Sequence, residues 1–235
     1  LIVGQFQVSD PMFKRELRLS VLDYAPYRVR VGDASADLTY DRGLMLGTPL
    51  AGGDLVLMVV NGQGLAEASD RRVYDVDRFK NLAGHFSRDL GPLRLGLFGY
   101  YGVEEDDAGV NDEIVLWGPD ATIPIGSAGE VNFQYLRRTD SNPSFLLTEP
   151  ADEATVDAAM AEVVLWPQGP AGRLFFTALY NHVESQDGLF SVRLGEAAAL
   201  DRYRVGSTGA SYLLARNLRP AGPGHRAACL LVPEE

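Results

Sequence analysis

Ten segments of the chain alternate apolar and polar residues, and the connections between them differ in length. Alternation with a period of two is typical of β-strands, because successive side chains point to opposite faces. The expected strands are residues 1–8, 38–47, 55–62, 79–88, 93–102, 112–125, 130–138, 158–166, 173–183 and 203–214. The short connections are 48–54, 89–92, 126–129 and 167–172, and the long ones are 9–37, 63–78, 103–111, 139–157 and 184–202.

Short and long connections follow one another in a regular order along the chain. Short turns at one end of the strands and long loops at the other are typical of transmembrane β-barrels, whose strands need only about 9 to 11 residues to cross. No stretch approaches the roughly 18 to 20 apolar residues of a membrane-spanning helix. The sequence therefore predicts an all-β fold, an antiparallel up-and-down transmembrane β-barrel.

Both ends of the chain look incomplete as a barrel. Residue 1 opens directly into an apolar strand pattern without a secretory segment, so upstream strands and a signal peptide are expected to be missing. Near the other end, the run from Pro220 is rich in Pro and Gly, which do not continue a strand. We expect a single barrel domain at 1–219, with about ten or eleven strands of a larger barrel, and an irregular or non-native tail at 220–235.

The two faces of the predicted strands differ in polarity, most clearly in residues 130–136. Three apolar residues, Val131, Phe133 and Tyr135, share one face. Three polar residues, Glu130, Asn132 and Gln134, share the other and are the expected lumen-facing side chains. Alternation alone also fits a soluble sandwich, whose apolar face would be buried. The asymmetry of the connections favours the barrel.

Charge and aromatic residues refine this picture. The formal net charge of −11 argues against a nucleic-acid partner, which needs a basic surface. Acidic residues gather in the long connections, where they form a solvated loop surface or bind divalent cations that bridge to lipopolysaccharide. Tyrosines and tryptophans near strand ends fit either a membrane-interface girdle or ordinary cross-strand packing.

Catalytic and metal-binding patterns are absent from the sequence. His85, His182 and His225 are far apart and form no metal motif, and the single Cys229 can form neither an internal disulfide nor a paired-cysteine metal site. His85 and His182 fall within predicted strands, where lumen-lining or interfacial polar roles are expected. We expect no enzymatic activity, no catalytic residues and no cofactor.

Short motifs in the first third of the chain resemble the outer-membrane porins related to the phosphate-selective porin family. They are the strand Val3-Gly4-Gln5-Phe6, the strand start Tyr40-Asp41-Arg42-Gly43 after a long gap, and the strand ending Val59-Val60-Asn61-Gly62. The order of strands and loop lengths over residues 1–219 carries more of the resemblance than any single residue.

The resemblance implies a water-filled, trimeric barrel in the bacterial outer membrane whose first long loop folds inward and narrows the pore. Family members use Arg and Lys near this constriction to attract anions. The corresponding candidates here are Lys14, Arg15, Arg18, Arg28, Arg30 and Arg42. The same gap also holds Asp10, Glu16, Asp23, Asp33 and Asp37, so these arginines can equally pair with neighbouring acids.

Three functions remain open at this point. The leading one is a porin for passive diffusion of small hydrophilic solutes or ions, with outer-membrane lipids and lipopolysaccharide as its surroundings. The second is a non-conducting barrel that sheathes a partner such as a multihaem cytochrome. The third is a soluble β-sandwich binding module, which would stay in solution without detergent.

Overall fold

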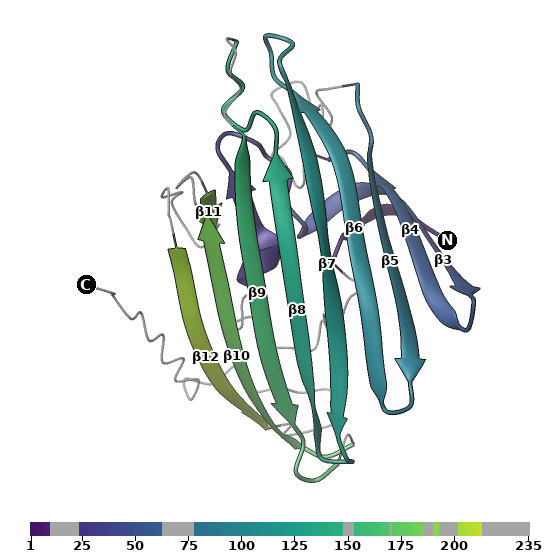
Figure 1. The fold of residues 1–235 in the computed structure, drawn as a ribbon. Helices are drawn as coiled ribbons and strands as arrows, with labels where there is room; N and C mark the ends of the chain where they lie inside the picture. Colours follow the sequence, from purple (N-terminus) through teal and green to yellow (C-terminus); the bar gives the residue numbers. More distant parts are fainter. Residues whose placement is uncertain are drawn as a thin grey trace.

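The structure is a computed structural model that describes residues 1–9, 24–62, 78–147, 153–169, 171–185, 190–192 and 202–212. Ten strands form one antiparallel sheet, in which neighbours in the sheet follow one another along the chain (Figure 1). The strands are β1 (Ile2–Gln7), β3 (Tyr40–Leu50), β4 (Gly53–Val60), β5 (Asn81–Leu90), β6 (Leu93–Glu105), β7 (Asn111–Ile125), β8 (Gly129–Asp140), β9 (Ala154–Leu165), β10 (Leu174–Ser185) and β12 (Arg202–Tyr212).

All ten predicted strands are confirmed, together with the antiparallel up-and-down order. The largest differences lie at strand ends. The connection 103–111 was expected to be long, which is wrong: Val103 pairs with Glu113, so only residues 106–110 connect β6 to β7. Strand β9 begins at Ala154, four positions before the predicted start at residue 158, within a run whose alanines give little contrast between faces.

The sheet is open. Strands β1 and β12 stand at its two ends and are not paired with each other in the described residues. The strands curve and twist together, so that the sheet has the form of a trough in Figure 1. Among the described residues, no helix is long and apolar enough to cross a membrane.

One short segment lies against one face of the trough. It contains the 3-10 turn η1 (Ala25–Arg28) and strand β2 (Val29–Val31), and β2 pairs with β11 (Phe190–Val192) in a separate two-stranded sheet. We call residues 24–39 the inner segment, and the face of the large sheet that it covers the inner face. These two three-residue strands were not predicted, because three residues are too few to show alternation.

The two ends of the strands differ, as the sequence predicts. Tight connections at 51–52, 91–92 and 126–128 lie at one end, which we call the turn end. Gly52, Gly91 and Gly126 have positive φ there, a conformation that glycine adopts without steric cost. The other end, which we call the loop end, carries the inner segment and the connections around residues 61–80 and 141–153.

An apolar cluster joins the inner segment to the inner face. Tyr27 and Leu38 of the inner segment pack with Met58, Phe98 and Leu136 of the sheet, all buried. Burying such side chains stabilises a fold by about 1.5 to 3 kcal/mol each. The inner segment is therefore a packed part of the domain.

Candidate functional site

The outer face of the sheet is apolar and exposed. Along β7 the residues Val115, Trp117, Ile123 and Ile125 are 41 to 49% exposed. The neighbouring strands continue the same surface. Its large exposed side chains are Leu44, Leu46, Leu57, Val59, Leu82, Leu95, Leu97, Tyr101, Val115, Trp117, Ile123, Ile125, Phe133, Phe176 and Tyr180. Soluble monomers rarely expose a contiguous apolar patch of more than a few hundred Å², and larger patches mark sites of interaction with proteins, ligands or membranes.

The height of this apolar surface can be worked out from β7. Its outward side chains are apolar from Val115 to Ile125, whereas the preceding outward residues, Asn111 and Glu113, are polar. Ten residue steps at about 3.3 Å give about 33 Å along the strand. At the tilt of about 40° usual in membrane barrels, this corresponds to a band about 25 Å high. We call this surface the apolar band.

Aromatic residues lie toward the loop end of the band. Trp117 and Tyr135 make an edge-to-face contact with ring centroids 6.4 Å apart. The Tyr135 hydroxyl donates a hydrogen bond to Asp157, whose carboxylate is also 3.8 Å from Arg137. An apolar ring with a polar edge facing charged groups is the arrangement that tyrosine and tryptophan adopt at a membrane interface.

The inner face buries polar side chains in addition to the apolar cluster. The strand register aligns two rows across the sheet near the turn end. One row contains Asp54, Ser87, Gly96, Asp120, Gln134, Met160 and Asn181. The next contains Asp89, Arg94, Thr122, Asn132 and Glu162. We call the polar members of these rows, with His85 and Glu130, the polar belt.

Arg94 links three polar side chains at the exposed end of the polar belt. Its guanidinium donates to Asp54 at 2.7 Å, to the hydroxyl of Ser87 at 2.8 Å and to Asp89 at 3.2 Å. The side chains of Asp54 and Asp89 are 64% and 68% exposed, so this corner of the belt is in contact with solvent. Exposed ion pairs of this kind contribute little to stability.

A buried histidine and aspartate pair lies farther across the belt. His85 Nε2 is 2.7 Å from an Asp120 carboxylate oxygen, and both residues are almost fully buried. The two side chains come from β5 and β7 and meet over β6, at Gly96. An added Cβ at Gly96 would collide with both partners, so glycine is needed there for the pair to form.

The third part of the polar belt is an amide and carboxylate network. Asn132 donates to Glu162 at 3.0 Å and to Glu130 at 3.2 Å, and it accepts a hydrogen bond from Thr122 at 2.9 Å. Asn132 and Glu162 have no exposed surface. Buried polar groups are costly unless they are hydrogen-bonded, and this network supplies the partners.

Two tyrosines of the inner segment complete this network. Tyr24 donates its hydroxyl hydrogen to Glu162 at 2.8 Å, and Tyr27 donates to the side-chain oxygen of Gln134. The three residues predicted to face a lumen, Glu130, Asn132 and Gln134, all lie on the inner face. The inner segment covers this part of the belt.

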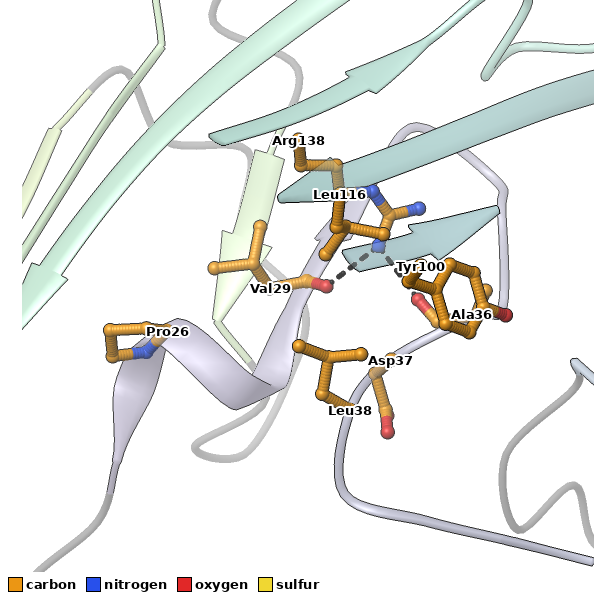
Figure 2. Close-up of a pocket in the computed structure, with 8 residues that line it drawn as sticks. All are labelled: Pro26, Val29, Ala36, Asp37, Leu38, Tyr100, Leu116 and Arg138. Carbon is orange, nitrogen blue, oxygen red and sulfur yellow. Dashed lines mark hydrogen bonds between the residues drawn. The ribbon is translucent and has the colours of Figure 1, made fainter. Parts of the chain in front are cut away.

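A buried arginine holds the inner segment near the loop end (Figure 2). Arg138 Nη1 donates to the backbone carbonyls of Val29 at 2.9 Å and Ala36 at 2.7 Å. The same guanidinium forms a fork with Asp140, with its shortest contact at 2.6 Å and both side chains almost fully buried. This charge-assisted pair is therefore an anchor whose loss would leave a buried carboxylate unpaired.

Glu104 makes a second anchor for the inner segment. Its carboxylate accepts hydrogen bonds from the backbone nitrogen of Ser35 at 2.9 Å and from the Ser35 hydroxyl at 2.6 Å. The backbone nitrogen of Asp33 also donates to the carbonyl of Pro143 at 2.8 Å. The inner segment is thus held by side chains of β6 and β8 and by the 141–147 connection.

Two buried carboxyl groups at the loop end, beyond the apolar band, have raised pKa values. Burial raises the pKa of Asp112 from 3.8 to about 6, against the opposing hydrogen bond from the backbone of Asn142. Burial likewise raises the pKa of Asp41 to about 6, although it accepts hydrogen bonds from the backbone of Arg42 and Gly62. Loss of water around the charged form is the dominant cause in both cases.

Of the six basic residues predicted to line a constriction, Arg28, Arg30 and Arg42 lie in the described part of the chain. Arg28 and Arg30 belong to the inner segment and are partly buried, and Arg30 pairs with Asp37 at 3.3 Å. Arg42 lies on β3, next to Asp41. Lys14, Arg15 and Arg18 fall outside the described residues. Within the described part of the chain, no group of three or more His, Cys, Asp or Glu residues is arranged to hold a metal ion.

Sequence reasoning missed several residues of this site. Asp120 and Glu162 in the belt, and the anchors Arg138 and Asp140, were not among the predicted site residues. The sequence did contain a signal for Arg138 and Asp140. The even-numbered residues of β8 share the inner face from Glu130 onward, and Arg138 and Asp140 are even-numbered residues of this strand. The hydroxyl contacts of Tyr24 and Tyr27 had no such signal, since they depend on how a long connection folds back.

Comparison with known proteins assigns the chain to no family. No protein-family model matches the chain, and neither the curated proteins nor the solved structures contain a match. The site is a curved antiparallel sheet with an apolar exposed face, a covered face that buries both polar and apolar side chains, and a segment packed against that covered face.

Proposed function

We propose that the chain forms part of a transmembrane β-barrel in a bacterial outer membrane and acts as a porin for small hydrophilic solutes or ions. The single observation that supports the proposal is the apolar outer face, on which fifteen large apolar side chains are exposed. The inner face already buries an apolar cluster and, beside it, polar side chains such as Asn132 and Glu162, and the inner segment covers it. In a soluble protein, an antiparallel sheet that packs one face on a core turns a polar face to water, so an apolar outer face fits a wall that faces lipid.

Membrane embedding accounts for both faces together. Lipid chains cover the apolar band, whose length of about 33 Å along β7 is enough to cross a hydrocarbon layer about 25 Å high at the strand tilt of outer-membrane barrels. The aromatic and charged residues at its loop end, such as Trp117, Tyr135 and Arg137, then face lipid headgroups and lipopolysaccharide. The polar belt faces the interior, where water and hydrogen-bonding partners satisfy it.

Closure of the barrel requires further strands. Strands β1 and β12 lie at the two ends of the sheet, and the backbone groups along their free edges pair with no other described strand. Unpaired backbone is not tolerated in a hydrocarbon layer. The proposal therefore includes strands beyond those described, from the same polypeptide or from another chain, and these complete the wall. A trimer of such barrels, as the porin resemblance implies, is part of the same proposal.

The inner segment narrows the interior of the proposed pore. It is anchored by Arg138 and Glu104 and packed by Tyr27 and Leu38, so it is a fixed obstruction on one side of the lumen. Solutes would pass between this segment and the opposite wall. A fixed inward loop limits solute size in the way that a constriction does.

The test is single-channel recording of the full-length protein, extracted in detergent from the cells that produce it and added to a planar bilayer. Discrete conductance steps are the expected result. A folded, detergent-dependent protein that gives no steps would favour the sheath around a partner such as a multihaem cytochrome. A chain that stays monodisperse without detergent would instead support the soluble binding module.

A further inference from the structure

We infer that the proposed pore prefers cations over anions, an inference that rests on the proposed function and adds the charge class of its solutes. It follows from the placement of charge on the two faces of the sheet. The carboxylates that the described strands place on the inner face are Asp41, Asp54, Asp89, Glu104, Asp112, Asp120, Glu130, Asp140 and Glu162. The arginines of the same strands that share this face are Arg94 and Arg138.

Most other arginines of the described strands point outward. Arg88, Arg137, Arg202 and Arg204 share the outer face with the apolar band, as the strand register shows. The outer face also carries Glu105, Glu113, Asp157 and Glu184, so its charges nearly balance, whereas carboxylates outnumber arginines on the inner face. A lumen lined mainly by one sign of charge attracts ions of the opposite sign.

The polar belt holds five carboxylates, Asp54, Asp89, Asp120, Glu130 and Glu162, against one guanidinium, that of Arg94. Asp120, Glu130 and Glu162 are buried, so the charge of the belt that solutes would meet is that of its exposed corner. Asp54 and Asp89 are more than 60% exposed, while Arg94 lies between them. This exposed corner alone has a formal charge of −1, because two carboxylates outweigh one arginine.

The first long connection does not add a net positive charge to the negatively charged inner face. Residues 9–37 contain five basic residues and five acidic ones, and so have no formal net charge. In its described part, Arg28 and Arg30 are balanced by Asp33 and Asp37, and Arg30 is ion-paired with Asp37. Five of the six basic residues that suggested anion preference are thus matched by acidic residues of the same connection, and the sheet determines the sign of the charge inside.

The test is the reversal potential of the full-length protein in a planar bilayer with a potassium chloride gradient. The double variant Asp54→Asn, Asp89→Asn changes the exposed corner from a charge of −1 to +1, and Arg94→Gln changes it to −2. All three side chains are at least 40% exposed, so folding should survive. The matched control is Glu113→Gln, which removes one negative charge from the outer face at the loop end.

The parent protein should be more permeable to potassium than to chloride. A charge a few ångströms from a watery pathway changes local ion occupancy by roughly two- to fivefold, so the double variant should lower the permeability ratio by about that factor. Arg94→Gln should raise the ratio, and Glu113→Gln should leave it unchanged.

Chloride preference in the parent protein, or a ratio that neither exposed-corner variant changes, would overturn the inference and leave the proposed porin standing. A folded, membrane-embedded protein without conductance would overturn the proposed function and this inference together. Circular dichroism of each variant in detergent checks that its strands are intact before the ratios are compared.

Discussion

An arginine placed in the middle of the apolar band should destabilise the protein strongly, but only if that band faces lipid. Leu97 is a suitable position, because it is 56% exposed and pairs with Pro119 and Phe86 on the outer face. Counted along β7, Pro119 is four steps from Val115, which places it about 10 Å from the loop end of a band about 25 Å high. Leu97 therefore lies near the bilayer midplane.

The expected cost of Leu97→Arg follows from this depth. Arginine at the midplane of a membrane barrel costs about 2 to 4 kcal/mol, and the cost falls to about 0 to 1 kcal/mol near the interfaces. On a water-exposed surface the same substitution changes stability by about 0.5 kcal/mol or less. Ile125→Arg, at the turn end of the same band, is the matched control and should cost much less.

The assay is equilibrium unfolding by urea of the full-length protein in phospholipid vesicles, followed by tryptophan fluorescence. The free energy of unfolding should fall by about 2 to 4 kcal/mol for Leu97→Arg, and by no more than about 1 kcal/mol for Ile125→Arg. Equal and small effects at the two positions would refute the lipid-facing assignment of the outer face.

Three further predictions concern the inner face and the loop end. Arg138→Ala should lower the free energy of unfolding by about 3 to 5 kcal/mol, because it leaves Asp140 buried without its partner. Urea unfolding measures this change, and a loss below about 1 kcal/mol would show that Arg138 does not anchor the inner segment. Gly96→Ala should destabilise by about 1 to 3 kcal/mol, since its Cβ collides with the buried histidine and aspartate pair, whereas Gly99→Ala on the same strand meets open space and should be nearly neutral. For Asp112, the folded state keeps the proton up to about pH 6 while an unfolded aspartate loses it near pH 3.8, so its contribution to stability decreases as pH rises from about 4 to about 6. Asp112→Asn should remove this part of the pH dependence, and an unchanged slope in that window would contradict the raised pKa.

The strands could be predicted from sequence because each has two faces of different polarity. In β8, Glu130, Asn132 and Gln134 alternate with apolar residues, and the structure places the polar set together on one face as the alternation predicts. The pattern weakens where side chains are small, which is why the start of β9 at Ala154 was missed. Strand order followed from the connection lengths, since short turns force neighbouring antiparallel pairs.

The inner segment could be predicted only in part. The porin resemblance implies that the first long connection folds inward, and its described residues do pack on the inner face. The contacts that hold it there were not predictable: Arg138 binds the carbonyls of Val29 and Ala36, which lie more than a hundred positions earlier in the chain. Backbone carbonyls carry no residue identity, so no sequence pattern marks them as partners.

Quenching of Trp117 fluorescence by lipid would show directly whether the outer face lies in a membrane. The chain has two tryptophans, and Trp166 lies at the turn end, where its ring nitrogen donates to the carbonyl of Ser127. Trp166→Phe leaves Trp117, which is 49% exposed on the outer face, as the only tryptophan. In vesicles, brominated acyl chains should quench Trp117 strongly and aqueous iodide should not; strong quenching by iodide with no effect of brominated lipid would contradict the account.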